Sequence, residues 1–311
     1  MKFTFLGTSA GKPTRDRNLS AIAFSMQNES GWSLFDCGEA TQHQIQKSDL
    51  KSGSLNNIFI THLHGDHYYG LFGLIDSFKM EGRKKELSLF APSGLKKLLS
   101  CFMDISYEKL GFKLNIIEYK KYQVFKFDKY SVEVLPLVHS VESFAFLIKE
   151  YDKSDKIDKE ALQKDGLLPS KVYADIKKGK DVRVGQKLYI AKKYLLEPIK
   201  GRRVIVSGDN SKPKILGESL RDLDLLIHES TYTKEVYENL PVKVLHTTAY
   251  DIGKVAKEYG VKNLIVTHIS PRYNDKGEYP LRLIEEEIRE NYKGNLLIAK
   301  DFMTFSLEHK R

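Results

Sequence analysis

Residues 61–70 of this chain, THLHGDHYYG, are unusually rich in titratable side chains. Within six consecutive positions, directly after an apolar run, the stretch holds His62, His64, Asp66 and His67. In an extended segment the first two histidines point the same way, because side chains along a strand alternate with a period of two. A turn at the following glycine swings the aspartate and the third histidine toward a neighbouring position. One short loop after a strand can therefore serve two metal ions.

Three further candidate ligands close other apolar runs of the sequence. His139 ends VEVLPLVH, Asp209 ends RVIVSGD and His268 ends NLIVTH. Strand ends on one side of a sheet converge on a crevice, so separate strands can deliver imidazoles and carboxylates to one point. Zinc prefers such ligands, and two ions about 3.5–4 Å apart can clamp two oxygens and lower the pKa of a water to about 7. Manganese or iron suits the same residue types.

The composition indicates a globular protein with a packed core. The 311 residues are 41% hydrophobic and 11% aromatic, which is too apolar for disorder. No apolar run approaches the roughly 18 residues that a membrane span needs, and the N-terminal run is too short for a signal peptide. Cys37 and Cys101 give no disulfide framework, which fits a reducing cytoplasm. We therefore expect a cytoplasmic protein that does not enter a membrane.

Short β-branched and aromatic runs recur along the chain and predict strands. Helix-like segments fall between them at residues 39–48, 69–80, 93–102, 248–259 and 281–292. Strands followed by helices appear first in one half of the chain and again in the other. Two sheets that pack face to face with helices outside satisfy this order, which predicts an α/β fold with a single domain over residues 1–311.

The charge distribution favours a polyanionic partner. The formal net charge is +9 and the isoelectric point is about 9.1. Basic residues are concentrated between Lys171 and Lys193, where the opposing charges are Asp175 and Asp181. Residues 151–187 are rich in lysine and interrupt an otherwise regular series of strands, so we interpret them as an excursion from the single domain.

The constellation H-x-H-x-D-H, followed by a separate His, Asp and His, resembles the metallo-β-lactamase superfamily. The resemblance covers nearly the whole chain and implies an αβ/βα sandwich with a two-metal centre between its halves. It also implies the ligand sets, which are His62, His64 and His139 for one zinc, Asp66, His67 and His268 for the other, and Asp209 as the bridge. We therefore expect two Zn²⁺ per subunit, with Mn²⁺ or another divalent metal as the alternative.

Further motifs resemble one family within that superfamily, ribonuclease Z, the tRNA 3′-processing endonuclease. GTSAGKPTRDRNLS is similar to its P-x-K-x-R-N loop, with Pro13, Arg17 and Asn18 in register and Arg15 where lysine is usual. LFDCGEATQHQ at 34–44 is similar to its first motif. Three further segments of this chain are similar to motifs of the family. HEST at 228–231 is similar to its HEAT motif, HTT at 246–248 to its HST motif, and HISPRY at 268–273 to its last zinc-ligand segment.

The resemblance implies roles for individual residues. Asp66 would be both ligand and general base, the alternative being a ligand alone. Glu229 would orient His246, whose imidazolium donates a proton to the departing 3′ oxygen; the alternative is a structural hydrogen bond. Asp36 and Glu39 would orient the metal-ligating histidines and the adjacent loop, the alternative being that they bind metal themselves. Phosphates and bases near the cut would be positioned by Arg17, Asn18, Arg272 and Tyr273.

Residues 151–187 fall where ribonuclease Z enzymes carry a flexible arm that grips the tRNA away from the cut, often in trans across a homodimer. Lys177, Lys178 and Lys180 would belong to this clamp, which recognises tRNA shape and phosphates. The sequence departs from the family at the arm's Gly-Pro tip, where it reads GLLPSKVY. The alternative is a solvated, charge-rich loop.

The sequence thus predicts a zinc-dependent endoribonuclease that cuts precursor tRNA 3′ of the discriminator nucleotide. The products would be tRNA with a 3′-hydroxyl and a trailer with a 5′-phosphate, and the enzyme would act as a homodimer. Two alternatives stay open. One is another phosphodiesterase or hydrolase of the same fold, and the other is a noncatalytic RNA-binding protein with a metal-stabilised core.

Overall fold

The computed structural model describes residues 1–27, 29–105, 109–152, 156–274 and 279–309, which form two compact units. The first unit comprises Met1–Lys126, Val132–Ile148 and Arg203–Arg311, and the second comprises Phe127–Ser131 and Lys149–Arg202. Among the residues described, no helix is both long enough and apolar enough to span a bilayer.

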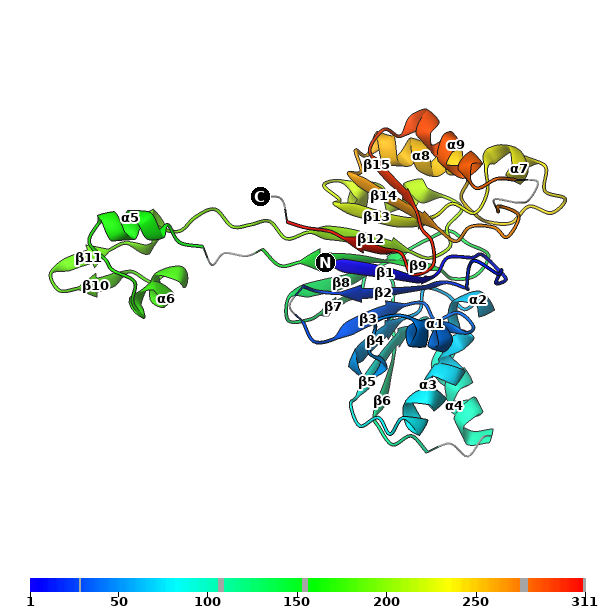
Figure 1. The fold of residues 1–311 in the computed structure, drawn as a ribbon, viewed down its shortest axis with the longest axis horizontal. Helices are drawn as coiled ribbons and strands as arrows, with labels where there is room; N and C mark the ends of the chain where they lie inside the picture. The colour runs from blue at the N-terminus through cyan, green and yellow to red at the C-terminus, as the bar shows by residue number, and fades with distance from the viewer. Residues whose placement is uncertain (28, 106–108, 153–155, 275–278, 310–311) are drawn as a thin grey trace. The chain divides into compact units, whose positions relative to one another are not determined.

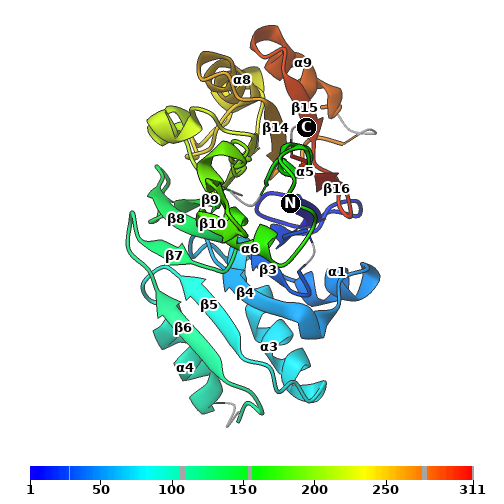
Figure 2. The same ribbon diagram turned by 90° about the vertical axis from the view of Figure 1, so that its left-hand side faces the viewer.

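Two seven-stranded sheets build the first unit (Figures 1 and 2). The first sheet has the order β16-β1-β2-β3-β4-β5-β6, from β1 (Lys2–Gly7), β2 (Ala21–Ser25), β3 (Trp32–Phe35), β4 (Leu55–Phe59), β5 (Leu87–Ala91), β6 (Leu114–Glu118) and β16 (Thr304–Ser306). The second has the order β15-β14-β13-β12-β9-β8-β7, from β7 (Val124–Lys126), β8 (Tyr130–Pro136), β9 (Phe144–Glu150), β12 (Arg203–Ser207), β13 (Leu225–Glu229), β14 (Asn263–Thr267) and β15 (Asn295–Ile298).

Helices cover the outer face of each sheet (Figure 1). The helices of this unit are α1 (Thr41–Lys47), α2 (Gly65–Tyr68), α3 (Gly70–Met80), α4 (Leu95–Ile105), α7 (Lys234–Glu238), α8 (Ala249–Glu258) and α9 (Arg282–Asn291), with short 3₁₀ turns η1 (Ser52–Ser54) and η3 (Pro213–Leu220). Five of them lie where the sequence predicts helices, with ends that coincide or differ by at most three residues. The predicted layout of two sheets with helices outside is confirmed.

Aromatic rings fill the space between the two sheets. Phe35 of β3 and Phe59 of β4 both contact Phe146 of β9, with ring centroids 5.5 and 5.3 Å apart. On β9, Phe146 points between the sheets while its neighbours Ala145 and Leu147 point to the helices, as the alternation of a strand requires. Because both faces of these strands are largely buried, most of their residues are apolar, and the two asparagines of β4 are half-buried.

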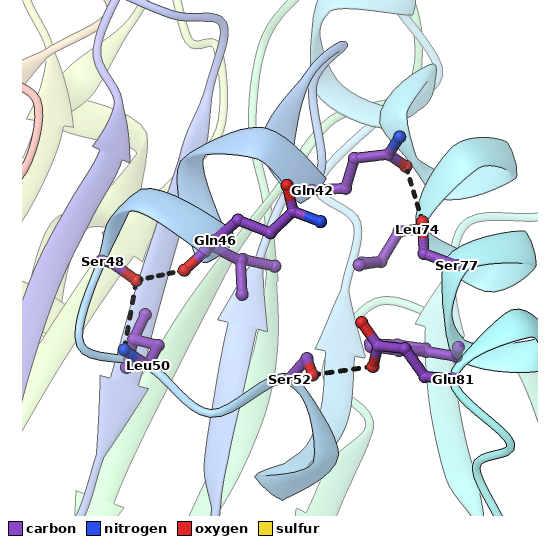
Figure 3. Close-up of a pocket in the computed structure, with 10 residues that line it drawn as sticks. Gln42, Gln46, Ser48, Leu50, Ser52, Leu74, Ser77 and Glu81 are labelled. Atoms are coloured by element: carbon purple, nitrogen blue, oxygen red, sulfur yellow. Dashed lines mark hydrogen bonds between the residues drawn. The ribbon is translucent and has the colours of Figure 1, made fainter.

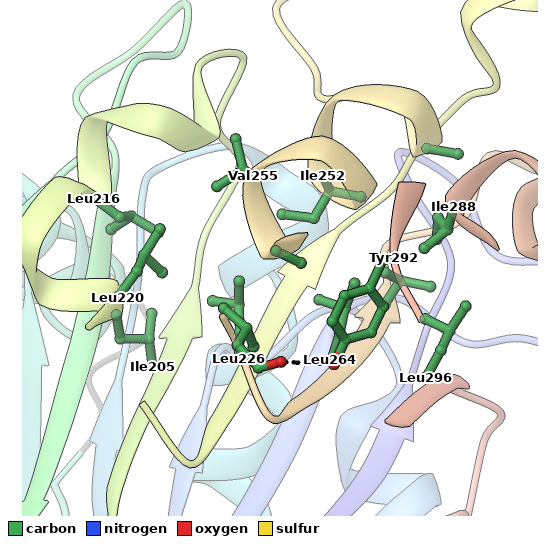
Figure 4. Close-up of a cluster of buried hydrophobic side chains, with 14 of the residues drawn as sticks. Ile205, Leu216, Leu220, Leu226, Ile252, Val255, Leu264, Ile288, Tyr292 and Leu296 are labelled. Carbon is green, nitrogen blue, oxygen red and sulfur yellow. Dashed lines mark hydrogen bonds between the residues drawn. The ribbon is translucent and has the colours of Figure 1, made fainter. Parts of the chain in front are cut away.

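The outer cores follow the same logic. Behind the second sheet, side chains such as Leu226, Leu264 and Ile288 are fully buried between the strands and the helices α8 and α9 (Figure 4). The two helices approach closely at Gly253, where a Cβ would lie 2.8 Å from the carbonyl oxygen of Ile288. A larger residue at this position would therefore push α9 away.

Behind the first sheet, α1 and α3 enclose a small cavity of about 100 Å³ (Figure 3). Ser52 Oγ donates to Glu81 Oε2 at 2.8 Å on its wall, and Ser77 Oγ donates to Gln42 Oε1 at 3.4 Å. None of the candidate ligands lines this cavity.

The second unit has its own small core. Its elements are α5 (Lys159–Lys164), α6 (Val172–Lys177), β10 (Val182–Val184), β11 (Lys187–Tyr189) and the turn η2 (Ala191–Lys193). The buried side chains of this core are Ile157, Leu162, Leu167, Tyr173, Ile176, Tyr189, Ala191 and Tyr194. Asp158 caps α5 by accepting a hydrogen bond from Ala161 N at 2.9 Å. The unit extends to Arg202, beyond the end predicted for the inserted segment at Lys187.

Candidate metal centre and active site

The candidate ligands meet at one edge of the two sheets of the first unit. His62 and His64 follow β4, Asp66 and His67 lie in α2, and the others follow β8, β12 and β14. Their donor atoms form groups that lie within 4.8 Å of one another, namely His62 with His64, His139 and Asp209, and Asp66 with His67 and His268. The structure thus brings together all seven residues that the sequence singles out as ligands.

Asp209 lies between the two groups. Its Oδ2 is 3.6 Å from His62 Nε2 and 3.7 Å from His139 Nε2. Its Oδ1 is 3.5 Å from the Nε2 atoms of both His67 and His268. Each carboxylate oxygen therefore faces one group, which is the arrangement that a bridging ligand needs.

Hydrogen bonds orient the imidazoles so that their free nitrogens point inward. His139 Nδ1 donates to the carbonyl oxygen of Leu245 at 2.7 Å, and His67 Nδ1 donates to Asp36 Oδ2 at 2.7 Å. The Nε2 atom of each ring then faces the centre, as is usual for metal-ligating histidines. Asp36 thus orients a ligand as predicted from its motif, whereas Glu39 is exposed and offers its carbonyl oxygen to Asn18.

Two of these residues adopt left-handed backbone conformations that favour glycine. The φ angle is 57° at Asp36 and 55° at His268. Such a conformation costs a residue with a side chain roughly 1–2 kcal/mol. Asp36 is held by donors at Thr61 N and Thr61 Oγ1, at 2.8 and 3.0 Å, and Thr231 Oγ1 donates to the carbonyl oxygen of His268 at 3.0 Å. The surrounding bonds therefore maintain strain at the site.

The charged groups at the centre shift one another's pKa values. Burial alone would lower the pKa of His67, but the carboxylates of Asp209, Asp36 and Asp66 outweigh it and hold that pKa well above its usual value. Burial would raise the pKa of Asp209, but the histidines around it bring that pKa well below its usual range. Burial lowers the pKa of His62 well below its usual value. The carboxylates stay ionised in a buried place, which requires positive charge beside them.

The donor set fits a divalent cation. His62 Nε2 is fully buried and has no hydrogen-bond partner, although it faces the centre. His67 Nε2 and His268 Nε2 lie 3.3 Å apart, and His139 Nε2 lies 3.1 Å from His64 Nδ1. Nitrogen lone pairs that converge in this way are stabilised by a cation between them, and imidazole with carboxylate suits zinc and related metals.

Glu229 and His246 form a buried pair beside the centre. His246 Nδ1 lies 3.0 Å from Glu229 Oε2 and 3.7 Å from Asp209 Oδ2. Burial lowers the pKa of His246, but the Glu229 carboxylate overcomes this and raises that pKa to about 9. The imidazole is therefore held in its protonated form by a carboxylate that also fixes its orientation.

Asn210 is a residue of the site that the sequence reasoning missed. It is fully buried, its N–H donates to Glu229 Oε1 at 2.6 Å and its Nδ2 donates to His228 Nε2 at 3.1 Å. Its Oδ1 accepts from Val138 N at 3.3 Å, next to the candidate ligand His139. The sequence signal was present, since an amide directly follows the candidate ligand Asp209.

The predicted substrate-binding loop is tied to the body of the protein. Arg17 Nη1 donates to Thr8 Oγ1 at 2.7 Å and to the carbonyl oxygen of Ala299 at 2.6 Å. Asn18 N donates to Asp301 Oδ2 at 2.7 Å. These groups hold the loop in place, and their predicted contacts with substrate stay a prediction.

Asp301 gathers three donors in this part of the structure. Besides Asn18 N, it accepts from Thr8 Oγ1 at 2.7 Å and from Gln44 Nε2 at 2.9 Å. Asp301 lies in no motif that the sequence reasoning used.

The other end of the predicted substrate-binding loop reaches the candidate metal centre. There Gly11 N donates to Asp66 Oδ2 at 2.8 Å.

The remaining predicted substrate contacts differ in exposure. Arg272 is exposed, whereas Tyr273 is 3% exposed and its hydroxyl contacts Thr233 N at 2.7 Å and Thr233 Oγ1 at 2.9 Å. A buried ring does not offer a face to a base. Lys177, Lys178 and Lys180 are exposed on the second unit at the end of α6.

Comparisons with known proteins cover nearly the whole chain. Residues 1–158 match the family model described as Anti-Pycsar protein Apyc1. The Ribonuclease Z of Marinobacter nauticus is 36% identical over 312 residues, which is 99% of this chain and 97% of that relative.

Solved structures extend the likeness to three dimensions. The crystal structure of human tRNase Z, short form, matches with a TM-score of 0.69 and 26% identity over 99% of this chain and 100% of that one. The metallo-β-lactamase fold protein YhfI from Bacillus subtilis matches with a TM-score of 0.66 and 17% identity over 98% of both chains. The predicted metallo-β-lactamase fold is confirmed.

Proposed function

We propose that this chain matures the 3′ ends of tRNA. The chain belongs to the ribonuclease Z family over 99% of its length. Through residues 1–158 it also belongs to the family of the Apyc1 model. It is a hydrolase, an endoribonuclease that cuts precursor tRNA 3′ of the discriminator nucleotide. The products are a tRNA 3′-hydroxyl and a 5′-phosphorylated trailer. The ribonuclease Z relative matches both halves of the chain, including the segments of Glu229 and His246 and the part of the second unit after residue 158, which the Apyc1 model does not reach.

The observation that carries this proposal is the position of Asp209 between two converging sets of donors. His62, His64 and His139 would hold one Zn²⁺, and Asp66, His67 and His268 the other, with Asp209 shared. Mn²⁺ is the alternative occupant. When bound, two such ions act as Lewis acids that polarise a phosphate and acidify water.

In the proposed mechanism, the His246–Glu229 pair supplies the proton for the leaving group. Because Glu229 holds His246 Nδ1, the Nε2–H of the imidazolium is available to donate to the departing 3′ oxygen. Thr231 Oγ1 and Asn210 N also contact the Glu229 carboxylate, which fixes its position. The carboxylate then stabilises the positive charge that His246 must keep until the bond breaks.

Asp66 is proposed to act on the attacking water. Its Oδ2 accepts from Gly11 N and faces His268 Nε2 at 3.3 Å, which anchors one side of the carboxylate. The side chain is 12% exposed, so the group borders the solvent side of the centre. We assign proton acceptance from water to this carboxylate, in addition to its role as a ligand.

A cleavage assay tests the proposal. The full-length protein is incubated with a 3′-extended tRNA precursor, with and without a chelator, and both product ends are mapped. We expect one cut after the discriminator nucleotide, loss of cutting with the chelator, and recovery with added Zn²⁺ or Mn²⁺. An intact precursor in the presence of either metal would refute the function. Cleavage of a small phosphodiester without cleavage of the precursor would favour another hydrolase of the same fold.

The second unit is proposed to be the arm that binds tRNA at a distance from the cut. Neutralising Lys177, Lys178 and Lys180 together should weaken precursor binding and reduce its salt dependence, because each phosphate contact releases counterions. The rate on a small phosphodiester should stay unchanged. An equal loss on both substrates would contradict this role.

The proposal includes a homodimer in the cytoplasm, in which the arm of one subunit serves the metal centre of its partner. Mixing two inactive variants tests this arrangement, one altered at His246 and one at the three lysines. Activity recovered in the mixture supports action in trans, and a mixture as inactive as its components opposes it.

A further inference from the structure

An exposed aromatic ring lies beside the candidate ligands. Tyr69, between α2 and α3, is 56% exposed, and its N–H donates to the carbonyl oxygen of Gly65 at 2.9 Å. A Cβ at Gly65 would lie 2.2 Å from Cε2 of the Tyr69 ring, so the ring rests against the α-carbon of that glycine. Gly65 separates His64 from Asp66. The ring therefore borders the loop that carries both ligands.

Further rings continue from Tyr69 along the helices. Tyr68 lies edge-on to it, with ring centroids 5.0 Å apart and planes at 76°, and packs on the core beneath α3. Phe72 follows at 6.4 Å from Tyr68, and Phe102 of α4 at 4.8 Å from Phe72. We call Tyr69, Tyr68, Phe72 and Phe102 the aromatic track. It starts at the ligand loop and ends in Phe102, which is 38% exposed.

Cations lie on another loop that contacts Asp66. Gly11 donates to the Asp66 carboxylate, and the exposed residues that follow it include Lys12 and Arg15, with Asp16 as an opposing charge. Proteins bind single-stranded nucleic acid by stacking its bases on aromatic rings and by placing cations beside its phosphates. A track of rings continuous with a phosphodiester-cutting centre therefore favours RNA over a protein as its occupant.

Other aromatic residues near the centre are less accessible. Tyr273 is buried, and the Tyr232 ring is half-buried at 6.2 Å from the ring of His246. Tyr69 is the aromatic side chain of the ligand loop whose face is open to a ligand.

We propose that the aromatic track binds the unpaired nucleotides 3′ of the cut, with Tyr69 stacked on a nucleotide that follows the first one. The proposal rests on the function proposed above and adds the path of the trailer. Bases of the acceptor stem are already stacked in a duplex, whereas trailer bases are free to stack on rings. Stacking accepts any base, since every base has a π face.

Kinetics with two trailer lengths test the proposal. One precursor carries a single-nucleotide trailer and the other a longer unpaired trailer on the same tRNA. We expect Tyr69→Ala to raise KM for the long trailer by about fivefold or more, since one base–aromatic stack contributes on the order of 1–3 kcal/mol and about 1.4 kcal/mol corresponds to a factor of ten. The effect on the shortest trailer should be smaller, and Tyr69→Phe should restore the parental KM because the ring is retained.

Met80→Ala is the matched control, because Met80 is 78% exposed at the far end of α3. Equal KM values for Tyr69→Ala and Met80→Ala would overturn the proposal, as would an equal effect on both trailers. A shift of the oligomeric state in Tyr69→Ala or Phe102→Ala, measured by light scattering, would assign the track to a second copy of the chain instead.

Binding of a single-stranded RNA oligonucleotide, followed by fluorescence anisotropy, separates this inference from the proposed function. If the parental protein cuts the precursor but Tyr69→Ala binds the oligonucleotide equally well, only the inference fails. If the precursor stays intact while Tyr69→Ala still loses oligonucleotide binding, the function fails and the track remains an RNA site.

Discussion

A buried ion pair at the base of the second unit allows a quantitative prediction. Arg202 Nε donates to Glu150 Oε2 at 2.7 Å and Arg202 Nη2 donates to Glu150 Oε1 at 3.1 Å, while the side chains are 5% and 1% exposed. The backbone N–H of Glu150 also donates to the carbonyl oxygen of Arg202 at 2.9 Å. The pair therefore joins the two segments through which the chain enters and leaves the second unit.

Glu150→Gln removes the charge but keeps the shape, so the buried guanidinium of Arg202 loses the carboxylate that it contacts. Breaking such a pair costs about 3–5 kcal/mol, whereas replacing both partners by apolar residues is often close to neutral. We expect amide hydrogen exchange at the base of this unit to speed up by roughly two to three and a half orders of magnitude, since about 1.4 kcal/mol corresponds to a factor of ten. The double variant Glu150→Met with Arg202→Met should recover most of the protection.

A second pair between the same two segments serves as the control. Lys200 Nζ lies 3.0 Å from Asp152 Oδ2, but the side chains are 87% and 47% exposed. Lys200→Ala should leave the exchange rates close to parental, because water screens an exposed pair. Hydrogen exchange followed by mass spectrometry reads out both variants. Equal exchange in Glu150→Gln and Lys200→Ala would refute the argument that burial makes the first pair strong.

Three other changes have definite expected outcomes. His246→Ala should lower kcat by about 10²–10⁴-fold with little change in KM for precursor tRNA, because the side chain acts on the leaving group; a proportional rise in KM instead would indicate a binding role. Dialysis against a chelator should lower the unfolding temperature, and Zn²⁺ should restore it, since bound metal stabilises the folded state by mass action; an unchanged temperature would contradict metal binding. Leu226→Ala should lower the free energy of unfolding by about 2–5 kcal/mol in urea titrations, because Leu226 is fully buried and leaves a cavity, whereas the exposed Leu168→Ala should change it little.

The fold was predictable because its elements have strong local signals. The long helices α3, α8 and α9 follow apolar patterns of helical period, and α8 begins at Thr248, whose side chain accepts a hydrogen bond from Asp251 N. Short elements such as β6 and α2 were missed. Leu114–Glu118 is half-exposed on its sheet, and Gly65–Tyr68 is a single turn of helix, so neither shows a full period.

The site was also only partly predictable from the sequence. Residue types and positions after strands identified the candidate ligands, but exposure depends on packing that a sequence does not display. Arg17 shows this, because the guanidinium predicted to meet phosphate also donates to Thr8 Oγ1 and to the carbonyl oxygen of Ala299. Tyr273 is likewise buried by residues of another loop. Motif matching therefore located these residues without showing which atoms they contact.

The register of the parallel strands brings the candidate ligands together at one edge of the sheet. In the parallel sheet, Val206 pairs with Ile227, and Ile227 with Ile265, so the ends of β12, β13 and β14 lie level with one another. The residues that follow, Asp209 and His268 among them, consequently reach the same edge. A slip of one residue in β14 would turn its buried side chains to the opposite face and carry His268 away from Asp209. The sequence shows which predicted strands are followed by candidate ligands. The packing of apolar side chains on both faces of these strands fixes their register, and the register brings the ligands to the same edge of the sheet.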